Sequence, residues 1–223
     1  MKIITFNIRR GSWFWGWKSN GRKDKIAEII KSYETDIFCL QEALEFQYND
    51  IQLALPNYYK SYGVGRNDGK WKGEFCPIFY NKDRYELLDS GTFWLSNTPD
   101  KVGTSFPFAL SKRICTWVKL KEGDKEFFVY NTHYYRFFNG LRKKSIDLLI
   151  KRIRSPFVLV GDFNANINNS SMRDMKRFNY TYFDKKQIDF IITSKDIAIT
   201  SYNFDYERKY PSDHYALIGV LKF

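Results

Sequence analysis

The chain has 223 residues, of which 43% are hydrophobic and 27% are charged, a composition that suits a globular protein and excludes a disordered one. Its formal net charge of +11 comes from 36 basic and 25 acidic residues. A field of this sign concentrates polyanions, which favours a phosphate-bearing partner such as nucleic acid, with a general contribution to solubility as the alternative.

Short apolar runs, rich in β-branched and aromatic residues and bounded by turn formers, predict strands. In chain order these runs are 2–8, 37–40, 76–80, 114–120, 127–132, 157–160, 188–192 and 215–221. Helical spacing of apolar residues predicts two helices between them, one around Ile26, Ile29 and Ile30 and one over 141–153. Strands outnumber helices and do not alternate with them. We therefore expect an α+β fold in which two mixed sheets pack face to face with helices outside.

One domain is expected over residues 1–223, because the chain contains no linker, repeat or low-complexity tract. Cys39, Cys76 and Cys115 lie in apolar runs without Cys-x-x-Cys spacing, which excludes a zinc clip and predicts buried free thiols. The chain starts with a strand pattern rather than a leader, and no stretch reaches transmembrane length. These features predict a cytoplasmic protein.

Polar residues of catalytic types stand at the ends of the predicted strands. Both histidines, His133 and His214, lie in polar tripeptides beside apolar runs. Further polar breaks of this kind are Asn7, Glu42, Asp162, Asn164 and Asp189. Each alone could be a strand-end cap or a turn residue. A buried unpaired carboxylate is costly, however, and all these side chains bind hard cations or protons, so together they predict an active site.

Six short motifs follow one another along nearly the whole chain. They are Thr5-Phe6-Asn7-Ile8, Leu40-Gln41-Glu42, Asn131-Thr132-His133, Gly161-Asp162-Phe163-Asn164, Ile188-Asp189-Phe190 and Ser212-Asp213-His214. In this order they resemble the endonuclease/exonuclease/phosphatase superfamily. Segments 65–69, 73–80, 92–96 and 113–117 are similar to a bacterial branch nearest the deadenylase and nocturnin-like members. The resemblance implies a four-layer α/β/β/α sandwich like that of deoxyribonucleases, and a phosphoric-ester hydrolase that uses Mg²⁺, with Mn²⁺ as the alternative.

The resemblance also implies a metal side of the active site. Glu42 would bind Mg²⁺ with help from Asn7, and Asp213 would lie nearby as a second metal-side or water-ordering group. One carboxylate and one amide leave most of the coordination shell to water and phosphate oxygens, which suits Mg²⁺.

On the catalytic side, the resemblance pairs His214 with Asp189, and a carboxylate partner orients an imidazole and raises its pKa. This pair would contact the scissile phosphate or act as base. Asp162 is the other candidate for activating water or handling the leaving-group proton. Asn164 and His133 would donate hydrogen bonds to the non-bridging oxygens, where charge grows in the transition state.

The chain departs from the family pattern after His133. The bacterial branch usually continues as Asn-Thr-His-x-Asp-His, whereas Tyr135 and Arg136 stand here in place of the acidic residue and the second histidine. The change predicts a more basic and aromatic rim in which Arg136 contacts substrate. Arg142, on the basic second helix, resembles a phosphate-contacting position of the family, with a solvated helix face as the alternative.

The loop 9–18 combines basic residues with several aromatic ones. Trp13 and Trp15 could bind substrate by stacking on bases while the basic residues neutralise phosphates. Partial burial against the first helix and contact with a membrane interface are the alternatives.

The sequence therefore predicts a Mg²⁺-dependent phosphodiesterase, foremost a nuclease acting on DNA or RNA. The alternative is a phosphatase or phosphodiesterase that acts on a small nucleotide, a cyclic oligonucleotide or another phosphorylated metabolite. A non-catalytic nucleic-acid-binding protein with the same fold is disfavoured by the complete catalytic set. No obligate protein partner is implied.

Overall fold

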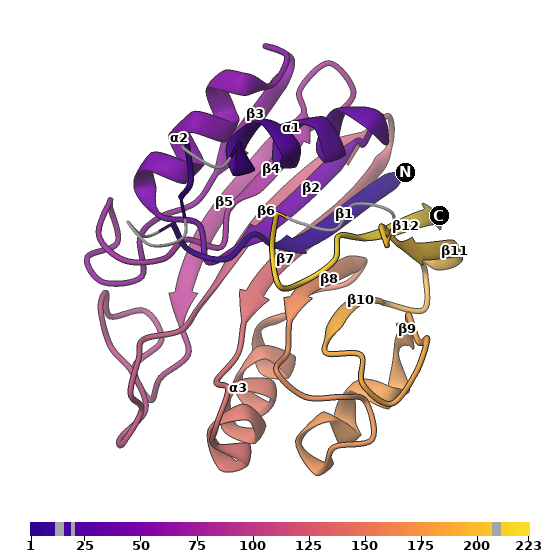
Figure 1. The fold of residues 1–223 in the computed structure, drawn as a ribbon. Coiled ribbons are helices and arrows are strands. Elements are labelled where there is room, and N and C mark those ends of the chain that lie inside the picture. Colours follow the sequence, from indigo (N-terminus) through magenta and orange to yellow (C-terminus); the bar gives the residue numbers. More distant parts are fainter. Residues whose placement is uncertain (12–15, 19–20, 207–210) are drawn as a thin grey trace.

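The computed structural model describes residues 1–11, 16–18, 21–206 and 211–223, and within them the strands form two six-stranded sheets (Figure 1). The first sheet has the order β11 (Ala198–Phe204), β12 (Leu217–Lys222), β1 (Lys2–Asn7), β2 (Ile37–Gln41), β4 (Ile78–Asn81) and β3 (Tyr59–Tyr62). The second has the order β5 (Glu86–Trp94), β6 (Ile114–Glu122), β7 (Lys125–His133), β8 (Phe157–Asp162), β10 (Asp189–Thr193) and β9 (Asn179–Tyr180).

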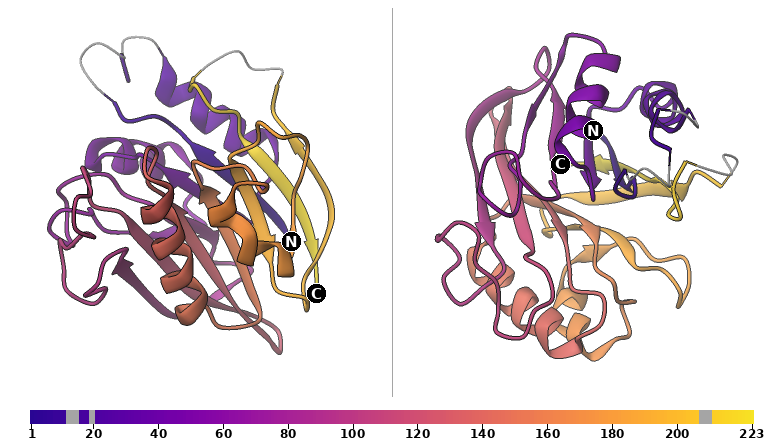
Figure 2. Two further views of the ribbon diagram at one scale, coloured as in Figure 1. Left: turned by 90° about the horizontal axis from the view of Figure 1, so that it is seen from below. Right: turned by 60° about the vertical axis from the view of Figure 1, so that its left-hand side comes forward.

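Helices cover the outer face of each sheet, as Figures 1 and 2 show. Helices α1 (Arg22–Ser32) and α2 (Glu45–Ala54) pack on the first sheet, where the predicted stripe of Ile26, Ile29 and Ile30 is buried. Helix α3 (Asn139–Arg152) and the 3₁₀ helix η2 (Ser170–Arg177) pack on the second. The predicted four-layer α/β/β/α sandwich is thus confirmed.

The alternation of side chains along the strands explains these layers. In β1, Ile3 points into the core between the two sheets, whereas Ile4 points outward to the helices. In β8, Val158 and Val160 point into the same inter-sheet core, and Leu159 packs towards α3. Central strands are therefore apolar on both faces, which is why they are continuous apolar runs in the sequence.

Two parallel strand pairs give the molecule an edge at which carboxyl ends of strands meet. Strands β1 and β2 pair in parallel and are connected through α1, and β7 and β8 pair in parallel and are connected through α3. The first pair ends at Asn7 opposite Gln41, and the second at His133 opposite Asp162. Helical crossovers are required for parallel neighbours, so the two predicted helices and the position of the polar strand ends are linked.

The strands that the sequence did not predict are β3, β5, β9 and β11, and these four form the outer edges of the two sheets. An edge strand has neighbours on one side only, so its side chains are less buried and its apolar signal is weaker. Most residues of β11, for example, are exposed or half-buried. The sequence analysis also missed α2 and η2, because α2 buries only Gln47 and Ile51 and η2 is a single short 3₁₀ segment.

The three cysteines are buried free thiols, as predicted. Burial raises the pKa of Cys39 and Cys115, and it raises that of Cys76 to about 12, so the thiolate forms are suppressed at neutral pH. Among the described residues, no helix combines the length and the apolar character needed to cross a membrane.

Candidate active site

The inner faces of the two sheets change from apolar to polar at one end of the sandwich. Along β8 the inward positions run Val158, Val160 and then Asp162, and along β1 they run Ile3, Thr5 and then Asn7. The polar strand ends predicted from the sequence are therefore the continuation of the inter-sheet core.

A layer of buried hydrogen bonds separates this polar end from the apolar core. Gln41 Nε2 donates to Thr5 Oγ1 at 3.0 Å and to Asn131 Oδ1 at 2.7 Å. Asn131 Nδ2 in turn donates to the carbonyl oxygens of Leu40 and Pro77, both at 2.8 Å. These bonds join β2 of the first sheet to β7 of the second, and they fix the strand ends that carry Glu42 and His133.

Asp162 lies at the centre of the site, because strand register brings its neighbours to it. In the ladders of β8, Asp162 is opposite His133 on one side and Asp189 on the other. Its Oδ1 accepts the backbone N–H of Asn164 at 2.8 Å, and its Oδ2 accepts Asn7 Nδ2 at 3.1 Å. The side chain is 1% exposed, and burial together with the nearby Asp189 raises the pKa of Asp162 to about 7.

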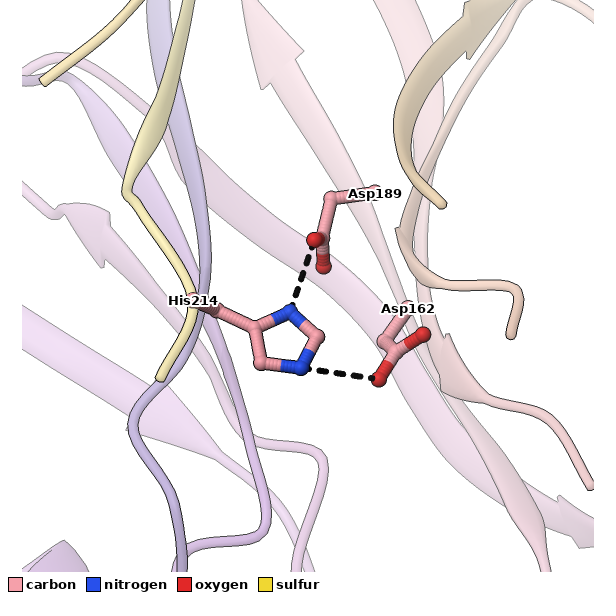
Figure 3. A group of neighbouring side chains, drawn as sticks. All are labelled: Asp162, Asp189 and His214. Atoms are coloured by element: carbon pink, nitrogen blue, oxygen red, sulfur yellow. Dashed lines mark hydrogen bonds and ion pairs between the residues drawn. The ribbon is translucent and has the colours of Figure 1, made fainter. Parts of the chain in front are cut away.

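His214 lies between two carboxylates (Figure 3). Its Nδ1 is 2.8 Å from Asp189 Oδ2, so it donates a hydrogen bond there, and its Nε2 is 3.7 Å from Asp162 Oδ2. Burial lowers the pKa of His214, but the hydrogen bond and charge of Asp189 outweigh it and raise the pKa to about 9. The predicted pairing of His214 with Asp189 is thus present, and at neutral pH the ring is an imidazolium.

Asp162, Asp189 and His214 offer ligand atoms that all lie within 4.8 Å of one another, so these three could hold a metal ion. The short His214–Asp189 hydrogen bond also allows them to act as a hydrogen-bonded acid–base group without an ion.

Across the site, Glu42 presents its carboxylate to the same pocket. Its Oε1 accepts Asn7 Nδ2 at 3.1 Å, and its Oε2 accepts the backbone N–H of Arg10 at 3.1 Å. Asp213, whose side chain is 56% exposed, is 3.8 Å from Arg9 Nη1. Glu42 and Asp213 offer carboxylate oxygens, which are ligands of the kind that Mg²⁺ prefers. Asn7 turns its amide nitrogen to Glu42, and its Oδ1 accepts the backbone N–H of Arg9 at 3.0 Å.

Strained backbone is concentrated around these groups. Arg9, Glu42 and Asn164 have positive φ angles of 55°, 61° and 49°, an uncommon conformation for residues with a side chain. Gly161 has φ of 145°, and a Cβ atom built on it would lie 1.9 Å from the carbonyl oxygen of Thr132. Glycine is therefore required directly before Asp162, because β7 passes too close for any side chain.

His133 is 5% exposed and joins the site to a second set of charges. Its Nε2 is 3.5 Å from Asp162 Oδ2, and its Nδ1 is 2.8 Å from Arg113 Nη1. Arg113 Nη1 is in turn 3.6 Å from Glu74 Oε2, which also pairs with Arg66. Burial first, and then the positive charges of Arg113 and Arg66, lower the pKa of His133 well below its usual value.

A pocket of about 340 Å³ contains these groups. Its lining includes Arg10, Glu42, Glu74, Arg113, His133, Asp162, Asn164, Asp213 and His214. The outer rim consists of Leu110, Arg136, Phe137 and Phe138, and Leu110 and Phe137 are 81% and 72% exposed. The rim thus combines a cation with apolar and aromatic surface. This aromatic surface comes from Phe137 and Phe138, because Tyr135 is only 3% exposed.

Two other expected binding residues have different surroundings. Asn164 lines the pocket and donates from Nδ2 to the carbonyl oxygen of Tyr134 at 3.1 Å. Arg142 does not line the pocket and is only 7% exposed, which corrects the alternative of a solvated helix face. Its guanidinium donates to the carbonyl oxygens of Tyr135 and Arg136 at 3.0 and 2.7 Å, so in this structure it supports the rim loop from behind.

Trp13 and Trp15 lie outside the described residues. Their neighbour Trp17 is described, and it is buried at 4% exposure with its Nε1 donating to Asp50 at 2.9 Å. For Trp17, burial is therefore the reading that holds among the three considered for this loop.

Arg22 was not predicted as a site residue, yet it connects both ends of the chain at the metal side. It is 1% exposed, and its Nε donates to the carbonyl oxygen of Pro211 at 2.9 Å. Its Nη2 donates to the carbonyl oxygens of Ile8 and Arg9 at 2.6 and 2.7 Å. Arg22 thereby holds the loop after Asn7 against the segment that leads to His214.

The sequence analysis missed Glu74 and Arg113 as lining residues. Arg113 and Glu74 lie within segments that resemble the bacterial branch, and that resemblance was the available signal for them. Arg10, which also lines the pocket, belongs to the loop 9–18, whose basic residues were expected to neutralise phosphates.

Comparisons with known proteins agree with this fold and site. The profile described as the Endonuclease/Exonuclease/phosphatase family matches residues 4–214. An endonuclease/exonuclease/phosphatase from Bacteroides vulgatus is 32% identical with a TM-score of 0.90, over 99% of this chain and 98% of that chain. The mannosyl-6-phosphatase Bt3783 of Bacteroides thetaiotaomicron is 28% identical with a TM-score of 0.88, over the full length of both chains.

A more distant relative is the CCR4-Not complex 3'-5'-exoribonuclease subunit Ccr4 of Kluyveromyces lactis. It is 24% identical over 95% of this chain, which spans only 31% of that protein. The predicted resemblance to this superfamily, in a bacterial branch nearest the deadenylase and nocturnin-like members, is confirmed, with the bacterial structures more similar than Ccr4.

Proposed function

The chain belongs to the endonuclease/exonuclease/phosphatase family and is therefore a phosphoesterase, and from this premise we propose that it is a Mg²⁺-dependent nuclease. The observation that carries the proposal is the convergence of His133, His214 and Asn7 on one carboxylate oxygen of Asp162, inside a pocket that also contains Glu42. In-line hydrolysis of a phosphodiester needs a group that accepts a proton from water and donors that neutralise the phosphoryl oxygens. This chain has both.

The two ionisable groups at the centre have complementary protonation states. With a pKa of about 7, Asp162 is ionised in half or more of the molecules at and above neutral pH and can take a proton from the attacking water. With a pKa of about 9, His214 keeps its proton and presents Nε2–H to the phosphate. Asn164 and His133 add uncharged donors at the same wall, where they stabilise the growing charge.

Mg²⁺ would be held by Glu42, with Asp213 as a further oxygen donor, and Asn7 would add its amide oxygen after a turn of its side chain. When bound there, the ion supplies positive charge to the phosphate oxygens and a template for water. Asn7 Nδ2 bridges Glu42 and Asp162 in this structure, so the two carboxylates are held apart by one amide.

Three features support nucleic acid as the substrate class. The net charge of +11 favours polyanions. At the rim, the Arg136 guanidinium lies 5.5 Å from the ring centroid of Phe137, a cation beside an exposed aromatic face that suits a nucleotide. The relative from Kluyveromyces lactis is named as a 3'-5'-exoribonuclease subunit.

A second candidate is a phosphatase or phosphodiesterase for a small phosphorylated metabolite. It is favoured by the full-length similarity to the mannosyl-6-phosphatase Bt3783 and by a pocket of about 340 Å³, which is near the lower end for small-molecule sites.

A substrate panel distinguishes the candidates. Single- and double-stranded DNA and RNA, cyclic dinucleotides, sugar phosphates and nucleotides are incubated with the protein and Mg²⁺, with Asp162→Asn and His214→Ala as blanks. If the wild-type protein cleaves oligonucleotides and neither of these two control variants does, the nuclease proposal is supported. Release of phosphate from sugar phosphates or nucleotides, with polymers left intact, assigns the second function instead. A parallel Mg²⁺ titration of activity in Glu42→Gln and Asp189→Asn tests which residues bind the ion. The Mg²⁺ concentration that half-saturates activity should rise in Glu42→Gln and stay unchanged in Asp189→Asn.

A further inference from the structure

We propose that Arg113 is a positioning residue that fixes the tautomer of His133, so that its Nε2–H always faces the substrate phosphate. The proposal rests on the proposed function for what His133 binds, but the tautomer itself is a property of the substrate-free protein. It assigns a role to a pocket-lining residue that does not belong to the six motifs.

The geometry between the two side chains determines which ring nitrogen carries the proton. Arg113 Nη1 is 2.8 Å from His133 Nδ1. A guanidinium has only donors and stays protonated in proteins, so Nδ1 must accept this hydrogen bond. The proton of the neutral ring is therefore on Nε2, the nitrogen that lies 3.5 Å from Asp162 Oδ2 on the pocket side.

Arg113 is itself held in place from two directions. Its guanidinium is 3.6 Å from Glu74 Oε2, and both side chains are only 12% exposed, so this pair is weakly screened. Its carbonyl oxygen accepts the backbone N–H of Leu95 at 2.8 Å, and the next residue, Ile114, accepts the hydroxyl of Thr132 at 2.9 Å. Thr132 directly precedes His133, so Arg113 directly before β6 and His133 at the end of β7 lie at the same end of this strand pair.

The orientation of the guanidinium also argues against a purely structural role. Arg113 Nε is buried without a hydrogen-bond acceptor among the described residues, whereas Nη1 is directed at the imidazole and at Glu74. The buried Arg22, by comparison, donates to backbone carbonyl oxygens at three sites. Arg113 Nη1 is instead directed at the imidazole of His133 and at the carboxylate of Glu74.

The consequence is that the two histidines bind opposite charges through Nδ1 and therefore act differently. His214 donates from Nδ1 to the carboxylate of Asp189. His133 has its Nδ1 bound to a cation and offers one fixed donor. Without Arg113 the His133 ring could adopt the other tautomer, which would place a lone pair, instead of a donor, against the phosphate oxygens.

The test begins with the wild-type protein. With only His133 and His214 in the sequence, the untagged ¹⁵N-labelled chain has two imidazoles, and a His214→Gln variant identifies their signals in long-range ¹H–¹⁵N spectra. The expected result is the Nε2–H tautomer for His133, and an Nδ1–H tautomer overturns the proposal without any change at Arg113. Because no substrate is present, this result is independent of whether the protein is a nuclease.

Variants then test the cause. Arg113→Met should give mixed tautomers and lower kcat for bis(p-nitrophenyl) phosphate about 10- to 100-fold, as expected for a positioning group, with KM for the ester nearly unchanged. Arg113→Lys keeps a charged donor and should restore part of both properties. Arg152→Met removes an arginine paired with Asp100 and is the matched control. An Arg113→Met protein with unchanged tautomer and kcat overturns the proposal.

Discussion

Replacing Asp162 by Asn should lower the activity strongly and, above neutral pH, make the folded protein more stable than the wild type. Asp162 is 1% exposed, and burial and Asp189 raise its pKa from 3.8 to about 7. Between these values the unfolded chain loses a proton that the folded chain keeps. The folded state therefore loses stability as pH rises through this window. Because Asn cannot ionise, the stability of the variant does not fall in this pH range for that reason.

The magnitude follows from the width of the window. A span of roughly 3 pH units at about 1.4 kcal/mol each sets an upper bound of about 4 kcal/mol at pH 8. The net gain is smaller, because Asp162 also contributes to keeping His214 protonated, and the variant loses that attraction. At pH 4 and below, a protonated Asp and an Asn differ little, so the two proteins should be nearly equally stable.

Urea denaturation followed by circular dichroism at pH 4, 6 and 8, in EDTA, measures this difference. Asp174→Asn, which changes a half-exposed carboxylate in η2, is the control and should leave the unfolding free energy nearly constant. The activity of Asp162→Asn on a diester should fall on the order of 10²- to 10⁴-fold. If the stability gap between the variant and the wild type does not widen from pH 4 to pH 8, the linkage argument is wrong.

Three further predictions concern the same site. The pH profile of kcat/KM should be bell-shaped, rising near pH 7 as Asp162 ionises and falling near pH 9 as His214 loses its proton. In Asp189→Asn, the alkaline limb of this profile should move to lower pH. Gly161→Ala should prevent stable folding, because its Cβ would lie 1.9 Å from the carbonyl oxygen of Thr132. The control is Gly123→Ala, which has open space around it and should lower the free energy of unfolding by only about 1 kcal/mol in thermal unfolding. Arg22→Met removes the arginine donor from three backbone carbonyl oxygens, so urea denaturation should show a loss in unfolding free energy on the order of 3 kcal/mol. In the same variant, the Mg²⁺ concentration that half-saturates activity should rise. An unchanged half-saturating concentration would contradict the role of Arg22 at the metal side.

The central strands and the catalytic types of residue could be predicted from the sequence because both depend on local pattern. Strands such as β8 are apolar on both faces, so Phe157 to Val160 form an unbroken run, and the polar Asp162 at its end is conspicuous. The edge strands escaped prediction for the opposite reason. Strand β5 is largely exposed along its first half, and its alternation is too weak to distinguish from a loop.

The supporting arginines could not be predicted, because their partners are distant in sequence. Arg22 contacts Pro211 across 189 residues, and the Arg113 guanidinium reaches His133 only because β6 and β7 pair. Arg142 was expected at the substrate, but its guanidinium is turned to the carbonyl oxygens of the rim loop. Side-chain type predicts a charge, but the charge's partner depends on packing.

By itself, then, the sequence determined the layers of the sandwich and the set of groups that could do chemistry, since strand periodicity and the polar strand ends are local properties. Only the tertiary structure decided how those groups act. The register of β7 and β10 against β8 places His133 and Asp189 opposite Asp162, and burial together with the charge of Asp189 raises the pKa of that carboxyl to about 7. Burial and register are collective properties of two packed sheets, and no single motif contains them.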